Sequence, residues 1–216
     1  MRFMAGELGL RERKKQRTRE QIAATARRLF VERGFDAVTV AEVAREADVS
    51  EGTVFNYFPT KEDLFYSGME LFEAQLIEAV RDRPPGESVL TAFRRIVLAG
   101  IPRLAEDDTV GLIATAARII GSSRSLQARE RELVAQYTRQ LAALVADELR
   151  RPADDVESAA AAAALMGAQR ALVAYVHATV LAGVRSAKLA AGARAQAKRA
   201  FARLERGLGD YAVKRG

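Results

Sequence analysis

The sequence predicts an all-α fold of about nine helices, with a small three-helix domain at the N-terminus followed by a larger helical domain. Composition is the first reason: alanine is frequent, aromatic residues make up 6% and prolines number 5. Alanine is the best helix former, whereas strands favour β-branched and aromatic side chains. The second reason is that apolar residues recur every three or four positions along most of the chain. With 216 residues, 49% of them hydrophobic, the chain can bury a sizeable core.

The first predicted helix covers residues 17–33. Its apolar residues Ile22, Ala26, Leu29 and Phe30 recur at helical offsets of three and four, and Gly34 provides a stop.

Two helices of about two turns follow directly. Thr39, with Glu42 three residues later, predicts a capping box at the start of one helix, and Ser50 caps the next. Pro59 ends that second helix, because the residue before a proline is disfavoured in the α region. Neither short helix can bury a face alone, so both need the helix at 17–33 beneath them. The pattern predicts a three-helix domain that contains a helix-turn-helix.

The rest of the chain is predicted to be helical as well, with breaks at prolines and glycines. The expected helices cover residues 60–83, 87–104, 108–120, 125–150, 155–182 and 187–213. We therefore expect a flexible basic arm at 1–14, a helix-turn-helix domain at 15–60, and a helical regulatory and dimerisation domain at 61–216.

Positive charge is concentrated at the N-terminus. Residues 1–19 hold seven basic and two acidic residues, and this excess is close to the net charge of +6 of the whole chain. Such a run is either a solvated tail or an arm that contacts a polyanion such as DNA. Its position directly before the helix-turn-helix favours the second interpretation.

Residues 39–64 contain three segments in a specific order and spacing: Thr39-Val40-Ala41-Glu42-Val43-Ala44, Val49-Ser50-Glu51-Gly52-Thr53-Val54-Phe55-Asn56-Tyr57-Phe58, and Lys61-Glu62-Asp63-Leu64. In these segments the chain strongly resembles the TetR family of bacterial transcriptional repressors. The resemblance covers residues 15–80 well and is only architectural beyond them. It implies a homodimer that binds a palindromic double-stranded DNA operator and is released by a small-molecule effector, whose identity the sequence does not reveal. Phe55 departs from the Tyr that the family often has, and Asp48 stands where the family usually has Gly.

The expected DNA contacts fall into three groups. Glu51 and Asn56 are the outward polar residues suited to reading bases. Small residues let the backbone come close to the duplex, and hydroxyl or cationic side chains suit phosphates at helix N-termini. The full expected set is Arg17, Thr39, Ser50, Glu51, Gly52, Thr53, Phe55, Asn56, Tyr57 and Lys61.

Side chains that could line an effector pocket lie in the C-terminal domain, although each apolar one is also a candidate for ordinary core packing. They are Met69, Phe72, Leu76, Phe93, Val97, Tyr137, Met166, Arg170, Tyr175 and His177. Arg170 is also a candidate for an ion pair at an interface.

The last two helices are expected to form the dimer interface. Small residues at 159–164 and Gly167 permit close approach, and the final helix carries an apolar stripe of Leu189, Ala193, Ala197, Phe201, Leu204 and Leu208.

An enzyme is not expected. The chain has one histidine, no cysteine, no glycine-rich phosphate loop and no metal-ligand spacing, so neither a cofactor nor a metal is predicted. The longest apolar run, at 159–168, is too short to span a bilayer, and we expect a cytoplasmic protein without a membrane partner. A DNA-binding regulator without any small-molecule ligand remains the open alternative.

Overall fold

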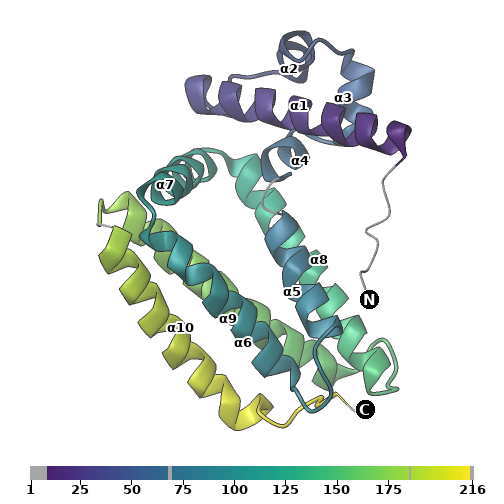
Figure 1. Cartoon of the computed structure of the whole chain (residues 1–216), viewed down its shortest axis with the longest axis vertical. Coiled ribbons are helices and arrows are strands. Elements are labelled where there is room, and N and C mark those ends of the chain that lie inside the picture. Colours follow the sequence, from purple (N-terminus) through teal and green to yellow (C-terminus); the bar gives the residue numbers. More distant parts are fainter. Residues whose placement is uncertain (1–8, 68–69, 185, 215–216) are drawn as a thin grey trace. The chain divides into compact units, whose positions relative to one another are not determined.

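The computed structural model describes residues 9–67, 70–184 and 186–214. Within these ranges the chain forms ten α-helices, one short 3-10 helix and no strand (Figure 1). The all-α prediction is confirmed. The chain divides into two compact units, residues 1–69 and residues 70–216.

Four helices make up the first unit: α1 (Leu10–Arg33), α2 (Val40–Glu46), α3 (Glu51–Tyr57) and α4 (Lys61–Tyr66). α1 packs against α2 and α4, and α2 packs against α3. Apolar side chains from these helices form one small core, which includes Ile22, Leu29, Phe30, Val43, Val54 and Phe58.

α1 begins at Leu10, earlier than the sequence pattern predicts. The residues before 17 are mostly Arg, Lys, Gln and Glu, which are good helix formers, so the helix extends beyond its apolar stripe. Gln16 supports this part through a hydrogen bond from its Nε2 to Glu20 Oε1 at 2.8 Å. Residues 10–14 of the expected arm are therefore helical, whereas residues 1–8 lie outside the described residues.

The pattern over residues 60–83 predicts one long helix, but α4 already ends at Tyr66. The Ser67 hydroxyl donates to the Leu64 carbonyl at 2.9 Å, which is a local bond that competes with helix propagation. Phe65 of α4 packs beside Phe30 and Phe35, with ring centroids 6.1 and 5.9 Å apart. α4 is thus part of the first unit, held by aromatic packing.

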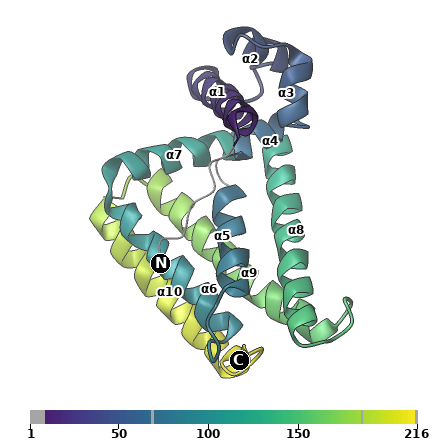
Figure 2. The same cartoon turned by 45° about the vertical axis from the view of Figure 1, so that its right-hand side comes forward.

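The second unit contains six α-helices and the 3-10 helix η1. Their bounds are α5 (Glu70–Arg81), α6 (Val89–Gly100), η1 (Ile101–Ala105), α7 (Asp107–Ser122), α8 (Arg124–Glu148), α9 (Val156–Leu181) and α10 (Ser186–Leu208). α9 runs through the middle of the unit, with α8 on one side and α10 on the other (Figures 1 and 2).

By length and composition, α9 is the one helix among the described ranges that could cross a membrane. The central helix of a protein core meets the same criteria. α9 packs against α7, α8 and α10, and its buried side chains, which include Leu165 and Val176, belong to the hydrophobic core of the unit.

The apolar stripe of α10 lies inside its own unit. Leu189, Ala193, Ala197 and Phe201 are fully buried, and the Phe93 ring of α6 lies 6.2 Å from that of Phe201. Leu204 and Leu208 pack against the same core. The expectation that this stripe forms the dimer interface is therefore corrected, because α6, η1 and α9 already cover it.

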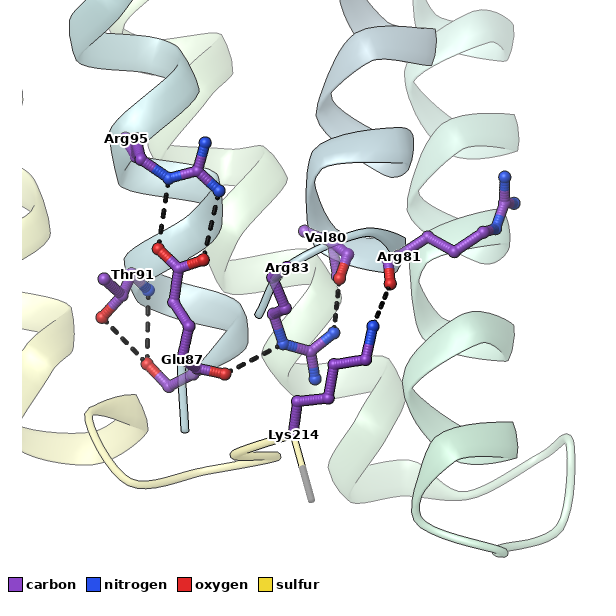
Figure 3. A network of polar contacts seen from close by, with 8 residues as sticks. Val80, Arg81, Arg83, Glu87, Thr91, Arg95 and Lys214 are labelled. Atoms are coloured by element: carbon purple, nitrogen blue, oxygen red, sulfur yellow. Dashed lines mark hydrogen bonds and ion pairs between the residues drawn. The ribbon is translucent and has the colours of Figure 1, made fainter. Parts of the chain in front are cut away.

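A buried arginine joins three segments that are distant in sequence. The Arg83 guanidinium donates to the Glu148 carboxylate at the end of α8, to the Val80 and Glu87 carbonyls, and to the Ala212 carbonyl at 2.8 Å. Figure 3 shows Arg83 between Val80 and Glu87, with Lys214 donating to the Arg81 carbonyl nearby. These bonds fix the C-terminal segment against the ends of α5 and α8.

Candidate nucleic-acid interface

α3 is a seven-residue helix with one buried and one exposed face. The Ser50 hydroxyl accepts the Thr53 amide at its start, and Pro59 follows its end. Val54 is buried in the core, and Phe58, just beyond the helix, is buried beside it. The opposite face presents Glu51, Gly52, Phe55 and Asn56, all exposed.

Phe55 and Asn56 lie outside the buried core of the unit. Phe55 is 48% exposed, so about half of this large apolar residue faces solvent. Asn56 makes no side-chain hydrogen bond within the described part of the chain. The half-buried Tyr57 likewise forms no hydrogen bond through its hydroxyl there. The outer face of α3 thus holds one aromatic ring and several polar groups available to an external partner.

Gly52 has no internal reason to be glycine. Its backbone is helical, and a Cβ atom there would meet only the Ser50 Oγ, at 3.9 Å. Glycine in a helix costs about 0.5–1 kcal/mol relative to alanine. No contact within the unit therefore accounts for the missing side chain at this position.

α2 and the turn after it hold α3 in place. The Thr39 hydroxyl and the Glu42 carboxylate form the predicted capping box at the start of α2. Arg33 of α1 donates to Glu42 at 2.6 Å, and these bonds, first of all the one from the Thr39 amide, lower the pKa of Glu42 to about 2. Asp48 adopts a positive φ of 54°, a left-handed conformation that Asp tolerates better than most residues.

The hydroxyls of the two cap residues are engaged within the protein. Thr39 Oγ1 donates to Glu42 at 2.9 Å, and Ser50 Oγ lies 2.8 Å from Thr53 Oγ1. Any phosphate contact from Thr39 or Ser50 therefore shares an oxygen that already serves a helix cap.

Lys61 is partly engaged inside the unit. A lysine at the positive end of a helix is electrostatically unfavourable, and a phosphate beside it would remove the conflict, which is why the sequence places Lys61 among the DNA contacts. Its ammonium instead donates to the Phe35 and Val38 carbonyls, both at 3.0 Å, and lies 4.2 Å from the centre of the Phe35 ring. Lys61 holds the connection between α1 and α2, and at most one of its three donors is left for a phosphate.

The start of α1 is strongly basic. Arg11, Arg13, Lys14, Lys15 and Arg17 are exposed, and none forms an ion pair with a described residue. By contrast, Arg19 lies 4.9 Å from the centre of the Phe58 ring, so it contributes to packing at the end of α3. The free cations create a positive surface on the unit that also presents α3.

Most of the expected pocket residues belong to the core of the second unit or pack against it. Leu76, Phe93, Val97 and Met166 are buried in one core, and Phe72, Tyr137 and Tyr175 pack against it. Arg170 is exposed and does not point into this core, and Met69 lies outside the described residues. His177 is half-buried. Burial lowers its pKa below the ordinary value, and the negative charge of Glu130 offsets part of this effect by raising the pKa.

The sequence analysis did not identify two glutamines that the structure shows to be buried or hydrogen-bonded. Gln21 of α1 donates to the Ala47 carbonyl at 2.8 Å and so anchors the end of α2. Gln169 of α9 is buried in the second unit. Gln169 lies four residues after Leu165 and seven before Val176, and this helical spacing predicts that it shares their buried face.

Comparisons with known proteins agree with this geometry. Residues 22–67 match the family model described as bacterial regulatory proteins, tetR family. The HTH-type transcriptional regulator TcmR of Streptomyces glaucescens is 31% identical over 104 residues, which cover 48% of this chain and 46% of TcmR. The match thus spans about half the length of this curated relative.

Two solved structures share the fold over most of the chain. The SmeT–triclosan complex aligns over 93% of this chain and 96% of SmeT, with a TM-score of 0.53 at 18% identity. FadR of Bacillus subtilis in complex with stearoyl-CoA aligns over 84% of this chain and 97% of FadR, with a TM-score of 0.51 at 20% identity. Residues 22–67 therefore form a domain of the tetR family of bacterial regulatory proteins, and the chain as a whole shares the fold of these solved structures.

Proposed function

We propose that the chain is a cytoplasmic transcriptional repressor that binds a palindromic DNA operator as a homodimer and is released by a small molecule. The observation that carries the DNA-binding part is the outer face of α3. It exposes Glu51, Phe55 and Asn56 beside a glycine that no internal contact requires. A major groove admits a helix of this kind, and its exposed polar groups can pair with base edges.

Base reading is assigned to Asn56 and Glu51. An Asn amide can pair with adenine, and a carboxylate can accept from the cytosine amino group. Tyr57, Arg17 and the cations at the start of α1 are assigned to the phosphate backbone, which gives affinity without sequence preference. Phe55 and Thr53 are suited to apolar contact with a sugar or a thymine methyl group.

The experiment is selection of bound sequences from random duplex DNA with the full-length protein, followed by binding titrations. The selected site should be a palindrome with half-sites about one helical turn apart, because a two-fold dimer presents two copies of α3. Asn56→Ala should relax the preference at one base pair, at a cost of about 1–3 kcal/mol on the preferred site. Equal losses on operator and random DNA would show that Asn56 reads no base.

The outer face of α9 is the proposed dimer seam. Small and apolar residues lie along it at helical spacing, and all are exposed: Val156, Ala160, Ala163, Gly167, Ala171, Ala174, Ala178 and Leu181. Val156 is 80% exposed and Leu181 52%, so this face leaves large apolar groups in water at both ends. A second copy of the same face, packed backbone to backbone, would remove them from solvent.

α10 is a poor surface for self-association by comparison. Its exposed face is dominated by cations, namely Lys188, Arg194, Lys198, Arg199, Arg203 and Arg206. Glu205, its one acidic residue, already pairs with Arg94 of α6 at 3.2 Å. Two such faces would repel each other across a two-fold axis.

The ligand-responsive part of the proposal has support from the second unit and from the two solved neighbours. This unit is far larger than a dimer seam on a single helix requires. SmeT was solved with triclosan and FadR with stearoyl-CoA, so the fold accommodates small molecules. The alternative is a regulator that binds DNA without a ligand. It predicts that no small molecule weakens binding to the selected site.

A further inference from the structure

The inner face of α9 contains a polar group in an otherwise apolar setting. Gln169 is 7% exposed and lies in line with the buried Leu165 and Val176. Its Oε1 atom is fully buried and accepts no hydrogen bond from any residue that the structure describes. A buried acceptor without a donor destabilises the fold, because it loses its hydrogen bonds to water and gains none in the protein.

The other buried polar side chains for which bonds are given in this unit do have partners. Ser158, about three turns earlier on the same face of α9, donates to Asp155 at 2.6 Å and lies 3.2 Å from the Tyr211 hydroxyl. The Ser88 hydroxyl caps α6, and Arg83 binds a carboxylate and three carbonyls. Among the buried side-chain nitrogen and oxygen atoms of the described residues, the Gln169 Oε1 is the single exception.

α9 contributes this face to an apolar core, and such a core disfavours a charged ligand. Leu165, Met166 and Val176 are buried on α9, and the aromatic rings of Phe72 and Tyr137 pack against the same core. Arg83, the fully buried cation among the described residues of the unit, is neutralised by Glu148. An ionised ligand group placed here would lose its hydration without an opposite charge.

We propose that Gln169 is a ligand-binding residue, whose Oε1 accepts a hydrogen bond from the hydroxyl or N–H group of an uncharged, mainly apolar effector. The inference rests on the proposed function and narrows it, because it assigns both a residue and a chemical class to the effector. The apolar body of the ligand packs among the core side chains, and one donor satisfies the amide oxygen.

The test uses a matched pair of probes on the full-length protein. 4-Hexylphenol carries a hydroxyl donor, and its methyl ether, 4-hexylanisole, has nearly the same shape without the donor. Thermal unfolding and calorimetric titration give the affinity of each probe for the wild type, for Gln169→Leu and for Gln169→Met. Gln140→Leu makes the same change at an exposed position of α8 and serves as the control.

The phenol should raise the Tm of the wild type by roughly 5–10 °C at about 100 times its Kd. It should bind the wild type roughly three to ten times more tightly than the ether, and this ratio should fall to about one in both Gln169 variants. Without ligand, Gln169→Leu or Gln169→Met should unfold at the same temperature as the wild type or higher, because each removes an unpaired acceptor. Gln140→Leu should keep the wild-type ratio.

Two results would overturn the proposal: a preference for the phenol that survives in both Gln169 variants, or no binding of either probe to the wild type. Binding to the selected operator is measured separately. A phenol that binds through Gln169 but leaves the operator complex intact would refute the ligand-responsive function while leaving the binding site in place.

Discussion

Gly52→Ala should affect protein stability and DNA affinity in opposite directions, so it distinguishes the role of Gly52 in folding from its role in DNA binding. Gly52 lies in the first turn of α3 and is exposed, and an added Cβ atom would find open space around it except for Ser50 Oγ at 3.9 Å. Alanine should therefore fit without strain and raise the free energy of unfolding by up to about 0.5–1 kcal/mol, the difference that applies inside a helix. If only folding mattered, the variant would be the better protein.

DNA binding should change in the opposite direction. A methyl group inserted where two surfaces already meet closely costs about 1–3 kcal/mol. That cost corresponds to an affinity roughly five to more than one hundred times lower on the selected operator. Binding is measured by fluorescence anisotropy at fixed salt, and stability by urea denaturation of the same preparations.

Gly111→Ala is the matched control. Gly111 is exposed in the N-terminal half of α7, and a Cβ atom there would meet nothing within 4 Å. This variant should gain stability in the same way and bind the operator with unchanged affinity. Wild-type affinity in Gly52→Ala would refute the argument, since α3 would then not approach the duplex at its N-terminal turn.

Three further predictions concern the seam, the basic surface and the cap of α2. Ala174→Glu on the outer face of α9 should give a monomer by light scattering at micromolar concentration, whereas the equally exposed Ala74→Glu on α5 should remain a dimer. The triple change Arg11→Gln, Arg13→Gln and Lys14→Gln keeps good helix formers but removes three charges. It should reduce the slope of log K for DNA binding against log salt by up to about 2–3. An unchanged slope would show that this segment makes no contact with the phosphate backbone. Glu42 has a folded-state pKa of about 2, below its ordinary value of 4.5, so its contribution to stability is present above pH 4.5 and lost as the pH falls toward 2. The stability difference between wild type and Glu42→Gln should shrink over this window, and a constant difference would contradict the assignment.

The helix-turn-helix could be predicted because its signals are local. The capping box of Thr39 and Glu42, the cap at Ser50 and the stop at Pro59 each act within a few residues, and the structure places α2 and α3 accordingly. The left-handed turn at Asp48 is local in the same sense. The buried face of each short helix also follows from apolar spacing alone.

The sequence could not show which distant part of the chain lies beside a given side chain. The spacing of apolar residues on α10 shows that this face is covered, but not that α6, η1 and α9 of the same protomer cover it. Lys61 likewise has the position of a phosphate ligand in the sequence, but the Phe35 and Val38 carbonyls, more than twenty residues away, lie beside its ammonium. The unpaired amide oxygen of Gln169 is a property of the folded structure, because it depends on which donors lie near it in space.

α9 links the proposals for the second unit, because its two faces have different assignments. Its inner face holds Gln169 in the core of the protomer, and its outer face carries the exposed stripe from Val156 to Leu181. α9 has 26 residues and leaves this stripe exposed in its own chain, and in the proposed dimer a second copy would cover it. In the proposed dimer, a ligand that orders or displaces the inner face would act on the same helix that forms the seam. Under this proposal the two α3 helices would have to match half-sites about one turn of DNA apart, so a change at the seam would favour release.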